Sequence, residues 1–369
     1  MNLRVPGPTP VPEQVLAASA RPMINHRGPE FRELIAQVTA DLKTAFRTKN
    51  DVLSLTSSGT GGLEAAVTNM LSPGERTLVV SIGVFGERVV KIAETFGANV
   101  NKLSFPMGTA ADPSSVREAL KRDPAIKTVF VTHNETSTGV TNDLAALSAV
   151  IKGEMGKNLV VDGVSSIGSI PCPVDEWGLD VAISGSQKGW MCPPGLAMVS
   201  VSPRAWDVMA RAKMPRFYFD LPAAKKALDK GETPWTPALS VMFALREGLR
   251  MVLAEGLDNV YRRHARLAAK TRRGVKALGL ELFADEKHAS NTVTAIKVPE
   301  GVDWKMVSGI LRDKYQVVLA GGQGSLTGKV FRIGHLGYVN DADIDQALAA
   351  LERALAAARA RGPVPTGGA

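Results

Sequence analysis

The sequence predicts an α/β protein with a mainly parallel sheet and a smaller C-terminal α+β domain. The first observation is six short apolar, β-rich runs in the first two thirds of the 369-residue chain, at 52–55, 77–81, 128–132, 159–162, 181–184 and 196–201. The second is a set of amphipathic stretches between several of these runs, at 62–71, 86–96 and 144–151. Strands that are apolar throughout are buried on both faces, which is typical of a parallel sheet covered by helices.

The third observation is a change of pattern after residue 238. Helical periodicity continues to about residue 278, shorter β-like segments follow at 292–298 and 316–319, and a last helix runs from 341 to about 358. We therefore predict an N-terminal arm at 1–18, a large domain at 19–255 and a small domain at 256–369. Because parallel sheets of this kind bind ligands beyond the carboxyl ends of their strands, functional residues are expected there.

Composition and charge argue against several functional classes. The net charge is +8, but the basic residues are scattered and aromatic residues make up only 5%, so we expect anionic substrates and no nucleic acid partner. No run approaches the roughly 20 apolar residues of a membrane span and no secretory signal is found, so we expect a cytoplasmic protein with no membrane partner. The two cysteines, Cys172 and Cys192, are expected to be reduced thiols, and we predict no metal site.

Two charged residues at the ends of successive apolar runs indicate the chemistry. Asp162 ends the run 159–162, and Lys188 comes shortly after the run 181–184. A lysine amine can form a Schiff base with pyridoxal phosphate, and a carboxylate can keep the pyridine nitrogen of that cofactor protonated. Alternatively, Lys188 is a surface lysine and Asp162 is a helix cap. Their position between apolar strands and Gly/Ser turns favours the cofactor site, because unpaired charge is costly there.

A glycine-rich segment, Gly59-Thr60-Gly61, joins the run 52–55 to the helical stretch after it. Its glycines let the backbone approach an anion, and a helix N-terminus supplies unpaired N–H groups. The segment therefore suits the phosphate of the cofactor, with a flexible turn as the alternative. It fits neither the dinucleotide-binding pattern nor the Walker pattern, which argues against nucleotide binding.

Four further residues each have two interpretations. Phe85, which follows the run 77–81 between two glycines, either stacks on the cofactor ring or belongs to the core. In the polar run 133–140, Thr136 can bond the cofactor, and His133 is either a general base or a structural residue that bonds loop backbone. Arg332 alternates with apolar residues in a short strand of the small domain. It either clamps a substrate carboxylate or forms a structural salt bridge.

Together these motifs resemble the class V, fold type I, pyridoxal phosphate-dependent aminotransferases, in particular the alanine–glyoxylate and serine–glyoxylate group. The resemblance covers nearly the whole chain and is carried most clearly by the segments 133–140, 161–166, 175–178 and 331–337. It implies a large domain with a mainly parallel seven-stranded sheet, and pyridoxal 5'-phosphate as cofactor. It also implies a small amino acid (serine or alanine) as amino donor and a 2-oxo acid (glyoxylate or pyruvate) as acceptor.

The resemblance further implies a role for each matching residue. Lys188 would be the Schiff-base lysine, Asp162 the partner of the pyridine nitrogen, and Arg332 the residue that binds the substrate α-carboxylate. The other cofactor-binding positions are the ring-stacking Phe85, Val164 on the opposite ring face, Thr136 near the ring oxygen, and Gly59, Thr60, Gly61, Gln187 and Thr236 at the phosphate.

Two segments are implied to act across a homodimer with shared active sites. Thr236 would reach the phosphate bound to the neighbouring subunit, and the segment 25–29, with His26 and Arg27, would reach the substrate there. Plant serine–glyoxylate enzymes have a tyrosine where this chain has His26. This departure concerns the contact that recognises the serine hydroxyl.

Three other functions stay open at this point. One is a class V aminotransferase with another donor, such as aspartate or an amino acid of purine breakdown. A second is a cysteine desulfurase-like enzyme, which would need a catalytic loop cysteine and usually a histidine stacked on the ring; Phe85 takes that place, and Cys192 lies just beyond the lysine. The third is a basic binding or scaffold protein, which would require lost catalytic residues.

Overall fold

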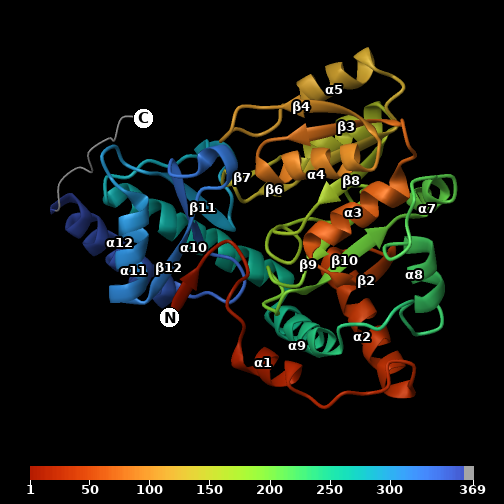
Figure 1. Ribbon diagram of the computed structural model, residues 1–369, viewed down its shortest axis with the longest axis horizontal. Coiled ribbons are helices and arrows are strands. Elements are labelled where there is room, and N and C mark those ends of the chain that lie inside the picture. The colour runs from red at the N-terminus through yellow and green to blue at the C-terminus, as the bar shows by residue number, and fades with distance from the viewer. Residues whose placement is uncertain (361–369) are drawn as a thin grey trace.

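Two bodies make up the protein, one around a seven-stranded sheet and a smaller one around a four-stranded sheet (Figure 1). The structure is a computed structural model and describes residues 1–360. The strands of the large sheet are β2 (Asp51–Ser57), β3 (Arg76–Ser81), β4 (Asn99–Ser104), β5 (Thr128–Thr132), β8 (Asn158–Asp162), β9 (Val181–Gly185) and β10 (Gly195–Val201). Their spatial order is β2-β10-β9-β8-β5-β3-β4; six strands run in one direction, and β10 runs in the opposite direction. The predicted α/β fold is confirmed.

All six strands predicted from the residue pattern are present, and burial explains that pattern. In β8, Leu159 and Val161 belong to the core on one face of the sheet, and Val160 belongs to the core on the other face. The residue pattern did not indicate β4, which forms one edge of the sheet. Because edge strands are partly exposed, β4 carries residues such as Asn99 and Lys102 at exposed positions and has no continuous apolar run.

Helices cover both faces of the large sheet. One core contains residues of α3 (Gly59–Met70), α4 (Val84–Thr95), α7 (Pro203–Met209) and α8 (Leu221–Leu228). The opposite core contains residues of α1 (Glu13–Ser19), α2 (Pro29–Phe46), α5 (Pro113–Arg122), α6 (Leu144–Ser148) and α9 (Leu239–Glu255). The helix expected at 144–151 is α6, which continues as a π-helical segment over Ala149–Glu154. Among residues 1–360, no helix has both the length and the apolar character needed to cross a membrane.

The smaller body combines the two ends of the chain. Its sheet has the order β1-β12-β13-β11, formed by β1 (Asn2–Arg4), β12 (Val317–Gly321), β13 (Val330–Gly334) and β11 (Val293–Lys297). Helices α10 (Leu257–Ala277), α11 (Trp304–Tyr315) and α12 (Asp341–Ala360) share an apolar core with this sheet. The N-terminal arm therefore starts as a strand of the small sheet, parallel to β12, before it runs to the larger body (Figure 1). The first turns of α10 still contribute Val260 and Tyr261 to a core of the larger body, so this helix contacts both bodies.

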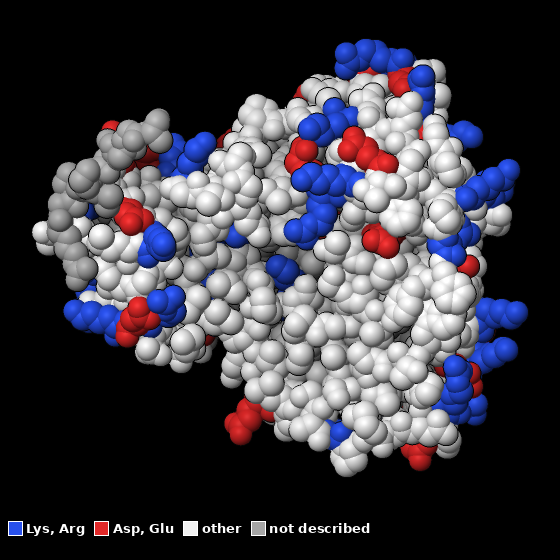
Figure 2. Space-filling model, viewed as in Figure 1, with Lys and Arg blue, Asp and Glu red and all other residues white. Residues whose placement is uncertain are grey.

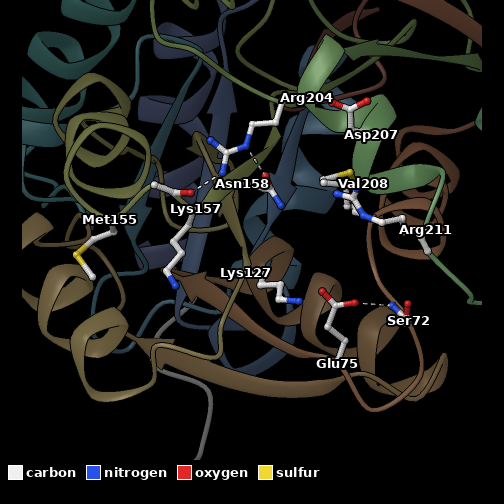
Figure 3. A pocket seen from close by; sticks show the side chains of 13 residues that line it. Ser72, Glu75, Lys127, Met155, Lys157, Asn158, Arg204, Asp207, Val208 and Arg211 are labelled. Atoms are coloured by element: carbon white, nitrogen blue, oxygen red, sulfur yellow. Dashed lines mark hydrogen bonds between the residues drawn. The ribbon is translucent and has the colours of Figure 1, made fainter.

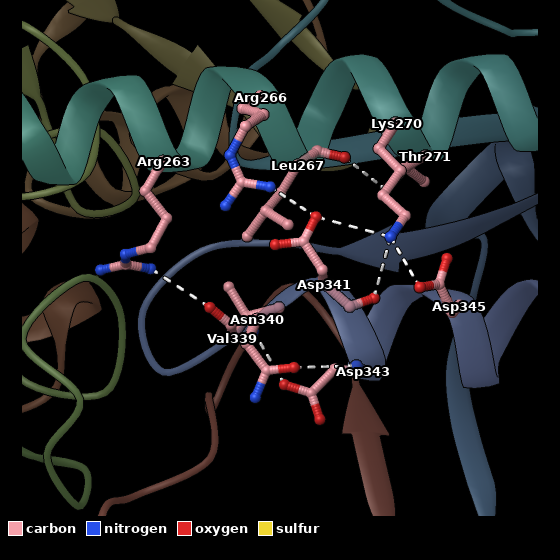
Figure 4. A network of polar contacts seen from close by, with 10 residues as sticks. All are labelled: Arg263, Arg266, Leu267, Lys270, Thr271, Val339, Asn340, Asp341, Asp343 and Asp345. Carbon is pink, nitrogen blue, oxygen red and sulfur yellow. Dashed lines mark hydrogen bonds and ion pairs between the residues drawn. The ribbon is translucent and has the colours of Figure 1, made fainter.

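A polar network joins α10 to the start of α12 (Figure 4). Arg266 pairs with Asp341, and Lys270 Nζ lies 2.7 Å from Asp345 Oδ2. These pairs are exposed to solvent, which screens their charges, so they contribute little to stability. The apolar contacts of Val275 and other buried residues beneath them do more to hold the two helices together.

Candidate active site

Lys188 and Asp162 meet at the carboxyl ends of adjacent parallel strands. Asp162 is the last residue of β8, and Lys188 follows the end of the neighbouring β9. Both residues line one small cavity. The residues that line it are Phe85, Asn134, Thr136, Asp162, Val164, Ser165 and Lys188. All except Asn134 and Ser165 are residues that the sequence predicted for one site, so the structure brings that group together.

The amine of Lys188 is suited to moving a proton. Its Nζ donates a hydrogen bond of 2.8 Å to the carbonyl oxygen of Pro6 in the N-terminal arm. Burial, and then the charge of Arg332, lower the pKa of Lys188 to about 8, while Asp162 acts in the opposite direction. An amine with this pKa can take up and release a proton near neutral pH, as a general acid–base residue must.

The N-terminal arm forms a wall beside that amine. A Cβ atom on Gly7 would lie 2.4 Å from Lys188 Nζ, and the φ of Gly7 is +152°, which L-residues rarely adopt. Thr9 Oγ1 donates a hydrogen bond of 3.0 Å to the backbone carbonyl of Lys188. Sequence reasoning did not assign these residues to the site, because their proximity depends on β1 pairing with the small sheet.

We expect Gly7→Ala to lower kcat about tenfold or more, because the added methyl group displaces the Lys188 amine from its working position. Gly74→Ala is a matched control: Gly74 also has a positive φ, +75°, but its Cβ would have no contact within 4 Å. Steady-state kinetics and thermal unfolding of both variants separate displacement of the amine from backbone strain. Wild-type kcat in Gly7→Ala would contradict a role for the arm in holding Lys188.

The carboxyl group of Asp162 sits in the wall of the same cavity. Its Oδ1 accepts a hydrogen bond of 3.0 Å from the backbone N–H of Val164. Burial is the main reason that the pKa of Asp162 rises to about 6, and the charges of Lys188 and Arg88 limit the rise. A protonated ring nitrogen next to this carboxyl group would favour its ionised form, because opposite charges stabilise each other most where water is excluded.

The Gly59 segment opens α3 with free N–H groups. The N-cap residue Ser58 makes no side-chain hydrogen bond to the helix, so the first turn of α3 is left to bind an anion. A Cβ atom on Gly59 would lie 2.7 Å from Val164 Cγ2, so only glycine allows this close approach. The free N–H groups and the close backbone approach fit a bound phosphate group. The side-chain Oε1 of Gln187 is buried and has no hydrogen-bond partner among the described residues, but an amide oxygen only accepts hydrogen bonds, so this atom does not itself bind a phosphate.

Phe85 lies in the first turn of α4, and Glu135 fixes its backbone. Glu135 Oε2 accepts hydrogen bonds from the N–H groups of Phe85 at 2.9 Å and Gly86 at 3.3 Å, while Oε1 accepts one from Ser137 Oγ at 2.6 Å. Burial raises the pKa of Glu135, and these hydrogen bonds oppose that change. Sequence reasoning named the polar run around Glu135 but missed this capping role. The density of polar residues in the run was the available signal.

Asn134 and Ser165 complete the polar wall of the cavity and were also missed. Asn134 Nδ2 donates hydrogen bonds to Ser165 Oγ at 2.7 Å and to Thr292 Oγ1 at 2.8 Å. Asn134 Oδ1 accepts a hydrogen bond of 2.6 Å from Ser290 Oγ. This buried network connects the large sheet to residues that precede β11, so it fixes the two bodies relative to each other at the site.

Arg332 lies in β13, and its side chain is buried without a carboxylate partner. Its guanidinium donates hydrogen bonds to the carbonyl oxygens of Gly321 and Thr136, at 2.8 Å and 3.0 Å, and to Gln323 Oε1 at 3.2 Å. No carboxylate of the described residues lies within ion-pair distance of Arg332. The interpretation of Arg332 as part of a structural salt bridge is therefore not supported. A buried positive charge beside the cavity favours an anionic ligand.

The residues expected to act across a dimer lie outside this cavity. Arg27 Nη1 is 2.7 Å from Glu232 Oε2, so the segment with His26 is tied to the loop that leads to Thr236. Thr236 lines a separate pocket with Trp235 and its neighbours. The two segments that the resemblance implies to reach a partner subunit thus lie together in one chain.

The cysteines and His133 do not reach the cavity. Cys172 and Cys192 are both buried, and burial raises the pKa of the Cys172 thiol to about 12 and that of Cys192 further. His133 packs edge-on against Trp177, with ring centroids 5.7 Å apart. Its Nδ1 has no hydrogen-bond partner among residues 1–360, so the expected bond to loop backbone is not found there. A cysteine nucleophile and a His133 general base are therefore both disfavoured.

A larger cavity lies at the opposite ends of the strands (Figure 3). Its volume is about 550 Å³, and its walls include Lys127, Asn158 and Arg204. Asn158 starts β8, whereas Asp162 ends it, so the larger cavity lies at the amino ends of the parallel strands and the smaller one at their carboxyl ends. None of the residues that the sequence predicted for catalysis or cofactor binding lines the larger cavity, and size alone does not make it the active site.

The fold and the small cavity define the class of protein. A buried amine, a carboxyl group at the neighbouring strand end, an aromatic side chain and an uncapped helix N-terminus are the groups that hold pyridoxal phosphate. The buried charge of Arg332, which has no ion-pair partner among the described residues, fits an anionic substrate. These features describe a fold type I pyridoxal phosphate enzyme.

Comparisons with known proteins identify the family. The model of the Aminotransferase class-V family matches residues 3–346. The chain is 41% identical over 361 residues to a serine–glyoxylate aminotransferase of Hyphomicrobium methylovorum, covering 96% of this chain and 89% of that protein. It is 46% identical over 354 residues to the soluble hydrogenase 42 kDa subunit of Anabaena cylindrica, covering 95% and 92%. The crystal structure of an alanine–glyoxylate aminotransferase from Nostoc superposes with a TM-score of 0.92 at 32% identity, covering 96% and 95%. This chain belongs to the class V aminotransferase family, whose cofactor is pyridoxal phosphate.

Proposed function

We propose that this enzyme transfers the amino group of serine or alanine to glyoxylate or pyruvate. The observation that carries the proposal is one small cavity bordered by the Lys188 amine, the Asp162 carboxyl group and, through Thr136, the uncompensated charge of Arg332. The names of the serine–glyoxylate relative and the alanine–glyoxylate structural neighbour support the same choice.

Each residue has a defined task in this reaction. Arg332 binds the α-carboxylate of the amino acid and orients its Cα–H bond. The amine of Lys188 would remove the proton from Cα and deliver it to the cofactor carbon that receives the amino group. Asp162 would stay ionised and stabilise a proton on the ring nitrogen, and Phe85 and Val164 would contact the ring. When bound, pyridoxal phosphate supplies the aldehyde carbon that receives the amino group and a ring that accepts electrons.

We expect Arg332→Gln to raise KM for the amino donor about 100-fold, because a charge-assisted pair with the carboxylate is lost. Steady-state kinetics with serine or alanine measure the change. Ethanolamine, which lacks the carboxylate, is the matched control substrate and should react equally slowly with both enzymes. A similar loss with ethanolamine would mean that Arg332 supports the fold of the site and does not bind the carboxylate.

A panel of amino donors tests the substrate proposal. Serine, alanine and aspartate are each supplied with glyoxylate and with pyruvate, and formation of the new amino acid is measured. We expect serine or alanine with glyoxylate to give the highest kcat/KM. If both fail while another donor works, the substrate proposal is wrong although the enzyme class stands.

We also propose a cytoplasmic homodimer in which each subunit completes the site of the other. Both cysteines are free thiols, which suits a reducing compartment. Phe217 and Tyr218 are exposed and pack against Trp235, close to Thr236. Figure 2 shows few charged side chains in the lower centre of the view, over α9 and α1. Exposed aromatic side chains such as Phe217 and Tyr218 are typical of a subunit interface.

Hybrid dimers test this arrangement. Lys188→Ala and Thr236→Glu, each inactive alone, are unfolded together, refolded and assayed. Random pairing should restore about a quarter of wild-type activity, since half of the dimers then contain one complete site. No recovery in dimers shown to be mixed would contradict sharing of the site.

A further inference from the structure

We infer that Arg88 is a positioning residue that orients the hydroxyl of Thr60 toward the cofactor phosphate and supports the ring of Phe85 from behind. The inference rests on the proposed function of the cavity and goes beyond it. Sequence reasoning assigned no role to Arg88, and it is not one of the residues that line the cavity.

Arg88 contacts both cofactor-binding elements at once. Its Nη1 donates a hydrogen bond of 3.1 Å to Thr60 Oγ1 in the first turn of α3. Its Cζ lies 4.7 Å from the centroid of the Phe85 ring, one helical turn earlier in α4. A single planar group thus joins the phosphate-binding helix to the ring-stacking helix.

The hydrogen bond determines what the Thr60 hydroxyl can do. Because the oxygen accepts from Arg88, its own proton is free to be donated in another direction. The first turn of α3 lacks a side-chain cap, so an anion bound there is the natural acceptor for that proton. Donation from a cation to the hydroxyl also polarises its O–H bond and strengthens the bond to the anion.

The charge of Arg88 is not neutralised by a neighbouring carboxylate. Arg88 forms no ion pair within residues 1–360, whereas the adjacent Glu87 pairs with Lys102 at 3.0 Å. The charge of Arg88 acts on the active site: it limits the rise in the pKa of Asp162, and it contributes to the lowered pKa of Lys188. A partly buried arginine that is left positive beside an anion-binding helix end suits a phosphate more than a structural role.

The contact with Phe85 supplies the second part of the role. A guanidinium group over one face of an aromatic ring leaves the other face available for stacking. Glu135 already fixes the backbone of Phe85 through its N–H group. Arg88 contacts the ring itself, so Glu135 positions the backbone of Phe85 and Arg88 positions its ring.

The test compares binding of pyridoxal 5'-phosphate with binding of pyridoxal, which lacks the phosphate. The full-length chain, freed of cofactor, is titrated with each compound, and binding is followed by absorbance and tryptophan fluorescence. The variants are Arg88→Gln and Arg88→Lys. Lys91→Gln is the matched control, because Lys91 is an exposed cation on the same helix.

We expect Arg88→Gln to weaken binding of pyridoxal 5'-phosphate about 10- to 100-fold. Binding of pyridoxal should weaken only about 2- to 5-fold, through the lost support of Phe85. Arg88→Lys, which keeps a charged donor, should recover most of the preference for the phosphorylated compound, and Lys91→Gln should leave both affinities unchanged.

Equal losses for the two compounds in Arg88→Gln would overturn the inference, because a merely structural residue would affect both alike. Wild-type affinities in that variant would overturn it as well. Either result leaves the proposed function intact, provided that the wild-type chain binds pyridoxal 5'-phosphate. If the wild-type chain fails to bind that compound, the proposed function itself is wrong.

Discussion

Lys188→Ala is expected to abolish transamination, lowering kcat by about 10⁴-fold or more. The variant loses both the covalent anchor for the cofactor and the group that moves the α-proton. Its alanine side chain cannot replace the amine that donates to the Pro6 carbonyl at 2.8 Å. Turnover and the absorbance of protein-linked cofactor should disappear together, and both are measured on the same purified sample.

Lys91→Ala is a suitable control for this experiment, because it removes an exposed lysine far along α4 from Phe85. An added small amine, such as methylamine, should restore part of the proton transfer in Lys188→Ala. It should not change the activity of the control, which keeps Lys188. Multiple turnovers by Lys188→Ala without added amine would contradict the assignment of Lys188 as the Schiff-base lysine.

Asp162→Asn is expected to lower kcat about 1000-fold, because the neutral amide no longer stabilises a proton on the ring nitrogen.

The same variant should change the pH dependence of cofactor binding. In the wild-type chain the pKa of Asp162 is about 6, so affinity should fall as the pH drops below 6 and the carboxyl group takes up a proton. That acidic limb should vanish in Asp162→Asn.

The stability of the cofactor-free protein should change in the opposite sense. Folding raises the pKa of Asp162 from 3.8 to about 6, so the folded state binds a proton more tightly than the unfolded state. Stability then falls as the pH rises from about 4 to about 6 and stays lower above that range. Asp162→Asn should therefore be more stable than the wild-type chain at pH 7 when both lack cofactor, as measured by denaturant unfolding. A less stable variant would contradict burial as the cause of the raised pKa.

Strand prediction succeeded where burial on both faces left a continuous apolar run. In β8 the run 159–162 was visible because its consecutive residues face two different cores. β4 was missed by the residue pattern because an edge strand tolerates exposed residues such as Asn99. The pairing of β1 with β12 was beyond prediction, since it joins residues more than 300 positions apart and rests on only three strand residues.

The active site was predictable where residue chemistry and strand ends coincide. Lys188 and Asp162 could be paired because parallel strands bring their carboxyl ends to one edge. Glu135 and Gly7 could not be assigned, because a capping contact and a clash depend on how distant segments pack. His26, Arg27 and Thr236 stay predictions, since their proposed partners belong to a second chain.

The most direct test of the proposed function is a half-reaction with the amino donor alone. Purified enzyme loaded with pyridoxal phosphate is mixed with serine or alanine in the absence of any 2-oxo acid, and the keto acid released is counted per active site. An aminotransferase working through Lys188 should release about one equivalent and then stop, and glyoxylate should restart it with formation of glycine. Continued release of product without an acceptor, or no release with any donor, would contradict the account.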